Sequence, residues 1–195
     1  MRTNMLPGAK FALVIGLAAS AFAFAGARPV SAQSELTPLT TEPKAALRLG
    51  VFLPANSTIR RQVGNTLPSV GADYYLGKNG SVGHNMVSVD YYDRGDGNHR
   101  LQVIPVTFGQ INHQYSNGQY SKAYFGYGVG AYFTTQNITD DLGFSQHHQT
   151  TLFGGFINLG TDLGDAFFVD ARYHLTSSTG TANPGGLQVS AGVRF

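Results

Sequence analysis

The chain has 195 residues, which is enough for one domain of moderate size. Its 13 Lys and Arg residues nearly balance its 11 Asp and Glu residues, and they form no basic stripe of the kind that binds nucleic acid. The sequence has no cysteine, which excludes disulfides and metal sites built from thiolates.

The first 32 residues have the features of a cleaved signal peptide. Arg2 and Lys10 precede an apolar run over residues 11–25, and residues 30–32 (Val-Ser-Ala) form a small-x-small cleavage pattern. The apolar run is shorter than the roughly 20 residues that a membrane-spanning helix needs. We therefore predict a signal peptide over residues 1–32, with an N-terminal membrane anchor as the alternative.

Residues 33–45 are polar and contain Pro38 and Pro43, a composition typical of a flexible tail or linker. Cleavage after Ala32 leaves 10 of the 13 bases against all 11 acids, so the mature chain carries a net charge of −1. The net positive charge of the full sequence therefore comes from the predicted signal peptide.

The rest of the chain predicts β-structure. Short runs of alternating apolar and polar residues are separated by clusters of Gly, Asn, Asp and Ser, at the spacing of an all-β sandwich or barrel. Pro105 removes a backbone donor, so a bulge and a change of facing at that residue remain open. The expected strands cover residues 46–53, 67–76, 84–93, 99–112, 121–134, 148–160, 166–176 and 186–195.

The connections between these strands predict an up-and-down barrel. Two long connections at 54–66 and 135–147 and a medium one at 177–185 nearly alternate with short connections, and 94–98 alone breaks the pattern. An up-and-down order would therefore gather the long loops at one end. The N-terminal tail would then lie at the opposite end, beside the short turns.

The last strand shows the alternation most clearly. One side of it would carry an apolar row, and the other side would carry Gln188, Ser190, Gly192 and Arg194. Chain ends fray unless an element holds them, so we expect this strand to close a barrel against 46–53. The apolar row is Leu187, Val189, Ala191, Val193 and Phe195.

Alternation alone does not distinguish a soluble barrel, with apolar side chains inside, from a membrane barrel, with apolar side chains outside. The charged residues favour the membrane barrel. A solvated strand surface normally carries many Lys and Glu residues. Here both glutamates of the mature chain, Glu35 and Glu42, lie in the tail, and Lys44, Lys78 and Lys122 lie in the tail or at turns.

The polar faces of the strands instead carry Gly, Ser, Asn and a few Asp and Arg, which suits a crowded lumen. A sheet that spans a membrane must close, because hydrocarbon offers no partners to backbone polar groups. The sequence therefore predicts an all-β fold, an antiparallel up-and-down eight-stranded transmembrane β-barrel over residues 46–195. A secreted, soluble, lipocalin-like barrel is the alternative. Tyrosine and phenylalanine near strand ends would form the aromatic girdles at the membrane interfaces: Tyr74, Tyr91, Tyr127, Phe133 and Tyr173.

Four segments resemble the small outer-membrane β-barrel domain family, the OmpA/OmpX/OmpW-like eight-stranded barrels. They are IPVTFG at 104–109, YFGYGVGAYF at 124–133, FFVDARYHL at 167–175 and the terminal strand that ends in Phe195. The resemblance implies an envelope of the Gram-negative type. We expect the apolar face of the barrel to contact outer-membrane lipids and residues 33–45 to form a short periplasmic tail. The resemblance also implies that Phe195 and the apolar row before it are recognised by the barrel assembly machinery.

Six charged residues are expected to point into the lumen. Isolated ions would be costly there, so they should pair, and an eight-stranded barrel is narrow enough for side chains to fill. Arg48 and Arg194 should lie near the same rim. We predict a structural ion-pair plug, with a narrow-solute channel as the alternative, formed by Arg48, Asp73, Asp90, Asp170, Arg172 and Arg194.

No catalytic, metal or cofactor site is predicted. His147 and His148 are consecutive on a strand and point opposite ways, which is poor geometry for chelation. His174 and Thr176 share the inward face, but Asp170 lies about 13 Å along the strand from His174, too far for a catalytic triad. We expect an outer-membrane protein with a structural or surface-interaction role, with a lipid A-modifying barrel enzyme as a further alternative.

Overall fold

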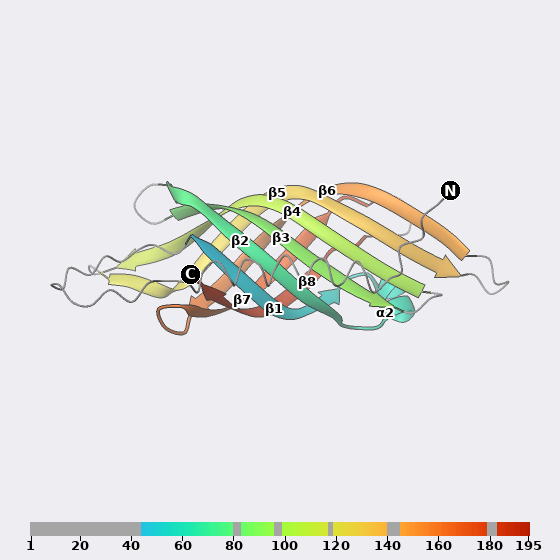
Figure 1. Cartoon of the computed structure of the whole chain (residues 1–195), viewed down its shortest axis with the longest axis horizontal. Helices are drawn as coiled ribbons and strands as arrows, with labels where there is room; N and C mark the ends of the chain where they lie inside the picture. The colour runs from blue at the N-terminus through green and yellow to red at the C-terminus, as the bar shows by residue number, and fades with distance from the viewer. Residues whose placement is uncertain (1–43, 80–82, 96–98, 117–118, 140–144, 179–182) are drawn as a thin grey trace, which may run out of the picture. The chain divides into compact units, whose positions relative to one another are not determined.

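The fold is seen in a computed structural model of the chain, which describes residues 44–79, 83–95, 99–116, 119–139, 145–178 and 183–195. Each strand pairs antiparallel with its neighbours in sequence, and the first strand pairs with the last, which closes the barrel (Figure 1). This confirms the predicted fold class. The strands are β1 (Ala45–Pro54), β2 (Leu67–Asn79), β3 (Gly83–Gly95), β4 (His99–Ser116), β5 (Gln119–Thr139), β6 (Ser145–Asp162), β7 (Phe167–Thr176) and β8 (Gly186–Arg194).

The strands β4 to β6 are longer than the sequence predicted. β5 continues to Thr139 and β6 begins at Ser145, so most of the expected loop 135–147 is paired strand. Its remaining residues, 140–144, lie outside the described residues. At the other end of the chain β8 stops at Arg194, so the expectation that the strand includes Phe195 was wrong by one residue.

Pro105 does not change the facing of β4. The pairs Val89↔Val106 and Tyr92↔Val103 keep one offset on either side of it, and Pro105 itself points inward. The register shifts lie elsewhere, between Tyr75 and Gly77 of β2 and between His113 and Tyr115. Gly77 has φ 123°, a backbone conformation that glycine adopts readily.

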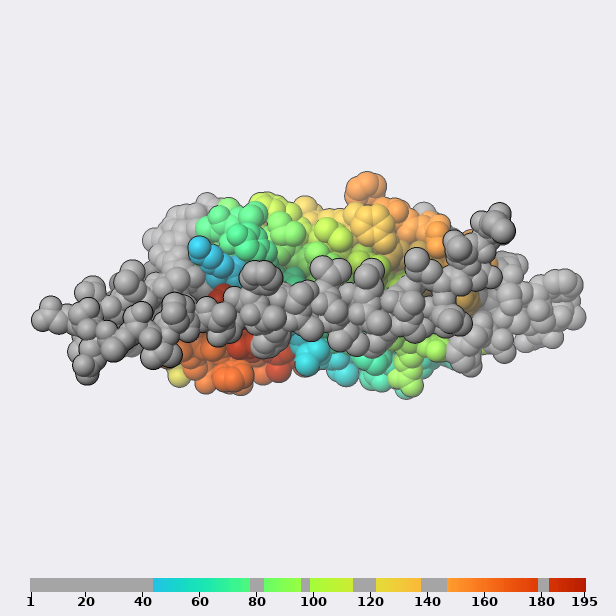
Figure 2. All heavy atoms as spheres, in the orientation of Figure 1, coloured from blue at the N-terminus to red at the C-terminus, as the bar shows by residue number. Residues whose placement is uncertain are grey.

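The outer surface of the barrel is apolar, as the alternation and the placement of Lys and Glu together predicted. Val129 of β5 is 68% exposed and Phe153 of β6 is 76% exposed, whereas Tyr132 and Leu152 on the inner side are buried. Side chains of β5 and β6 project from the wall along the upper edge of Figure 2. Exposed aromatic and branched aliphatic residues in this quantity are unfavourable in water and favourable against lipid.

The expected loop 54–66 contains a short helix, α2 (Ser57–Val63), which the sequence analysis missed. Asn56 caps its first turn, because Asn56 Oδ1 accepts from the Thr58 amide at 2.8 Å. Gly64, with φ 94°, ends it. Seven residues form only two turns, which is too short for a helical period to be seen against strand alternation.

In the part of the chain that the structure describes, no helix is long and apolar enough to cross a membrane. The predicted signal peptide, residues 1–32, lies outside the described residues and stays a prediction. Most of the expected tail, 33–45, also lies outside them, and its last residue, Ala45, is already the first residue of β1.

Candidate functional site

Arg48 of β1 is the centre of an ion-pair network that crosses the lumen. Its NH2 group donates to Asp73 Oδ1 on β2 at 3.0 Å and to Asp90 Oδ1 on β3 at 3.0 Å. The same group donates to Ser88 Oγ at 2.9 Å. The guanidinium is 1% exposed, so neither water nor salt screens these bonds effectively.

Arg172 of β7 reaches the same carboxylates from the opposite wall. Its NH1 group donates to Ser88 Oγ at 2.8 Å and lies 3.5 Å from Asp90 Oδ2. Its NH2 group lies 3.7 Å from Asp73 Oδ1 and 3.8 Å from Asp170 Oδ2. Two arginines are thus shared among three aspartates on β2, β3 and β7, and the network ties together strands that lie far apart around the barrel.

Neutral side chains complete the network. Ser88 Oγ donates to Asp73 at 2.5 Å, and Gln188 Nε2 donates to Asp90 at 3.1 Å. Ser190 donates to Asp170. Gly71 leaves the room that the ions need, because a Cβ there would lie 3.0 Å from Arg48 NH2 and closer still to Asp90.

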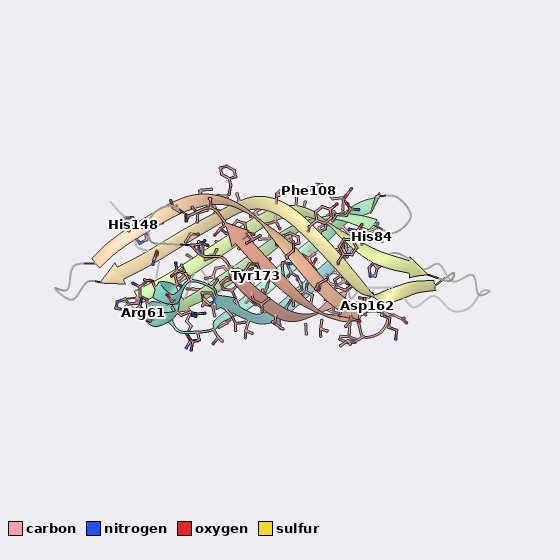
Figure 3. The ribbon with its side chains drawn as sticks, turned by 180° about the vertical axis from the view of Figure 1, so that it is seen from behind. Arg61, His84, Phe108, His148, Asp162 and Tyr173 are labelled. Carbon is pink, nitrogen blue, oxygen red and sulfur yellow. The ribbon has the colours of Figure 1, made fainter. Side chains whose placement is uncertain are left out.

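Arg194 points inward but does not join this network. It pairs with Asp162 of β6 and donates to the Tyr75 hydroxyl at 3.2 Å, and its Cζ lies 4.3 Å from the Phe168 ring centroid. Asp162 lies at the end of the barrel beside the short turns (Figure 3). Asp162 was not among the predicted lumen residues, although its parity with Asn158 and Phe156 on β6 could have identified it as inward.

The lumen has an apolar layer on each side of the ions, which the sequence analysis did not predict. One layer lies at the long-connection end, where Ile59 and Val63 of α2 enter the mouth of the barrel. Its buried residues are Phe52, Ile59, Val63, Leu67, Tyr92, Leu101, Val103, Tyr132 and Leu152. The other layer lies toward the short turns and contains Ala46, Met86, Ile111, Tyr124, Phe156 and Phe168.

His174 lies between the apolar layer at the long-connection end and the ions, since its Nε2 lies 3.3 Å from Gln188 Oε1 and Gln188 donates to Asp90. The Tyr92 and Tyr132 hydroxyls each lie 2.9 Å from one of its two ring nitrogens. The Tyr132 hydroxyl also donates to the Gly155 carbonyl at 3.0 Å, and the Tyr92 hydroxyl donates to Gln188 Oε1 at 3.2 Å. Both nitrogens are therefore engaged by tyrosines, and Thr176 donates elsewhere, to Asn183 at 2.8 Å.

The histidine pair of β6 is exposed. His147 Nδ1 lies 2.5 Å from Asn137 Oδ1, and His148 follows it with the opposite facing. The neighbouring residues Asp140 and Asp141 lie outside the described residues. Within the described ranges, no group of three or more His, Cys, Asp or Glu side chains could hold a metal ion.

Four of the five residues expected in the aromatic girdles are exposed on the outer wall: Tyr74, Tyr127, Phe133 and Tyr173. The fifth, Tyr91, has the same outward parity but is only 6% exposed. Its hydroxyl donates to Asp93 at 2.8 Å and accepts from Gln102 at 3.1 Å.

The apolar row of the last strand also faces outward. Leu187, Val189, Ala191 and Phe195 are exposed, and Val193 is half-buried. Whether these five residues form an assembly signal stays a prediction.

The sequence matches no protein-family model and no curated protein. Solved structures do match. Ail, the attachment invasion locus protein of Yersinia pestis, has a TM-score of 0.58 at 16% identity over 79% of this chain and 99% of Ail. The N-terminal β-barrel domain of Pseudomonas aeruginosa OprF has a TM-score of 0.51 at 14% identity, over 77% of this chain and 95% of the OprF chain. Neisserial surface protein A has a TM-score of 0.51 at 13% identity, over 77% of this chain and 94% of the neisserial chain. Ail was also solved in complex with the heparin analogue sucrose octasulfate.

These matches and the closed sheet define the class of the protein. It has the fold of the small eight-stranded outer-membrane β-barrels, as the resemblance in the sequence implied. At identities of 13–16% the likeness concerns the fold, and the function must be argued from this chain's own residues.

Proposed function

We propose that the protein is an outer-membrane β-barrel with a plugged lumen, which acts as a structural or surface-interaction protein rather than as a channel or an enzyme. The proposal depends on the side chains that fill the lumen. From one end to the other it contains an apolar layer with α2, a network of two arginines and three aspartates, and a second apolar layer. A solute would have to displace both apolar layers and separate buried ion pairs.

The outer wall supports the proposed location. Lipid would cover the exposed apolar residues of β1 and β4 to β8, and the girdle residues would lie at its two interfaces. In this proposal residues 1–32 direct export, the tail lies in the periplasm and the C-terminal apolar row contacts the assembly machinery. The long connections, with α2, then face the cell exterior.

The surface-interaction role has support from the neighbours. The name of Ail states attachment and invasion, and one Ail structure contains a sulfated ligand. A barrel of this size can therefore present a binding surface without a second domain.

Conductance tests the plug directly. The purified protein inserted into planar bilayers should give no steady single-channel currents, in a sample whose folded state is shown by faster migration on an unheated gel. Regular openings from that folded sample would favour the narrow-solute channel. Loss of an acyl chain from lipid A on overexpression would favour the enzyme.

A further inference from the structure

Three arginines lie at the end of the barrel that carries α2. Ile59 and Val63 of α2 are buried in the mouth of the lumen, so the opposite side of the helix faces away from the barrel. Arg60 and Arg61 lie on that side and are exposed. Figure 3 shows Arg61 at this end of the barrel, opposite the end with Asp162.

Arg94 of β3 joins them. It donates to the Thr66 carbonyl and, at 3.0 Å, to Thr66 Oγ1. A Cβ added at Gly64 would lie 3.1 Å from Arg94 Cζ, so the guanidinium is held against the end of α2. Arg60, Arg61 and Arg94 are named the α2 arginine surface here, since two of them belong to α2 and the third lies against its C-terminal end.

The other described arginines form ion pairs with aspartates. Arg48 and Arg172 bind the central aspartates, Arg100 binds Asp93, and Arg194 binds Asp162. In the described part of the chain none of the three arginines of the α2 surface has an ion pair, and the first turn of α2 has no acid. Their side chains keep hydrogen-bond donors available for a ligand.

We propose that the α2 arginine surface binds a sulfated polysaccharide at the cell exterior, an inference that rests on the proposed function because it requires this rim to face outward. Arginine forms paired hydrogen bonds with sulfate and phosphate groups. Arg60 and Arg61 are consecutive on a helix and diverge by about 100°. Divergent cations suit a chain with repeated sulfates better than one small anion.

The position of α2 favours a soluble polymer over lipid headgroup phosphates. Lipid phosphates would lie beside the outer wall, near the girdle residues, whereas α2 packs inside the rim over the lumen. A polymer arriving from the exterior reaches this surface without crossing the headgroup layer.

Retention on immobilised heparin tests the proposal, with full-length protein folded in detergent. The double variant Arg60→Gln/Arg61→Gln should bind heparin about tenfold more weakly, because two exposed ion pairs are lost. Arg94→Gln should weaken binding further. The matched control is Lys44→Gln/Lys122→Gln, which removes two exposed charges at the opposite rim and should bind as the unmodified protein does.

Three results would overturn the inference: no retention of the folded protein on heparin, equal losses in both double variants, or retention on heparin that lipopolysaccharide phosphates displace while dextran sulfate does not. Each sample is first checked for folded migration on an unheated gel. The orientation is tested separately with Ser57→Cys, the only cysteine in that variant, and a membrane-impermeant thiol reagent on intact cells. Labelling without heparin binding would contradict this inference alone, whereas absence of labelling would contradict the proposed orientation.

Discussion

Replacing Arg172 by methionine should destabilise the barrel without opening it. Methionine keeps most of the side-chain length, but it leaves Asp73 and Asp90 with Arg48 as their partner and removes the arginine that pairs with Asp170. Arg172 is buried with no exposed surface, and its Cζ lies 4.4 Å from the Phe156 ring centroid, so the variant loses ion pairs and a cation–π contact together.

The expected loss follows from the burial. Removing one partner of a buried ion pair costs about 3–5 kcal/mol, because the remaining charge has no compensation. The double variant Arg172→Met/Asp170→Asn removes one of the excess carboxylates as well. It should recover part of that loss, since Arg172 and Asp170 lie 3.8 Å apart.

The assay is urea unfolding of the barrel in lipid vesicles, followed by circular dichroism and by gel migration, because the chain has no tryptophan. The control is Arg61→Met on the exposed side of α2, which should change the free energy of unfolding by less than about 0.5 kcal/mol. A loss below about 1 kcal/mol for Arg172→Met, or large steady conductance from that variant, would refute the plug.

Three further substitutions test other parts of the account. Ile59→Ala should lower the free energy of unfolding by about 2–5 kcal/mol, because Ile59 on the buried side of α2 is 1% exposed, and an unchanged urea midpoint would show that α2 does not seal the mouth. Gly128→Val should prevent folding, since a Cβ there would lie 2.7 Å from the Phe108 carbonyl oxygen and would overlap the Phe156 ring; a normal folded fraction on an unheated gel would contradict this packing. Phe153→Lys should destabilise the barrel in vesicles by about 2–4 kcal/mol if that residue lies deep in the bilayer, and a neutral effect would argue against lipid at β6.

The sequence could predict the barrel because closure, strand facing and turn chemistry are local or periodic properties. Alternation puts Val129 and Phe153 on one side of the wall and Asp170 and Arg172 on the other, and the lack of Lys and Glu within the strands predicts that the apolar side is the outer one. Antiparallel pairing then brings strands together in chain order, and β1 is expected to meet β8 because a sheet in hydrocarbon must leave no unpaired edge.

The missed features depend on contacts between distant strands. Arg194 has Asp162 as its partner instead of the central aspartates because strand tilt and stagger decide which inward residues share a level. Alternation predicts on which side of the wall a residue lies, but it does not predict the position of that residue along the barrel axis. Arg194 was therefore grouped with Arg48 in the predicted ion-pair plug.

The helix α2 was missed for a different reason. Asn56 and Gly64 are a cap and a terminator that bracket it, and they were the available signal. The intervening seven residues are held in place mainly by burial of Ile59 and Val63 in the mouth of the barrel, which no local pattern reveals.

Tryptophan reporters test the central claim, that the apolar outer wall faces lipid, most directly. Val129→Trp places the only tryptophan of the chain on the outer wall of β5, and Phe168→Trp places it inside the lumen. In vesicles of brominated phospholipid, the fluorescence of the Val129→Trp variant should be strongly quenched and that of the Phe168→Trp variant should be nearly unchanged. Quenching of the lumen reporter by brominated lipid, together with quenching of the wall reporter by aqueous iodide, would contradict the account.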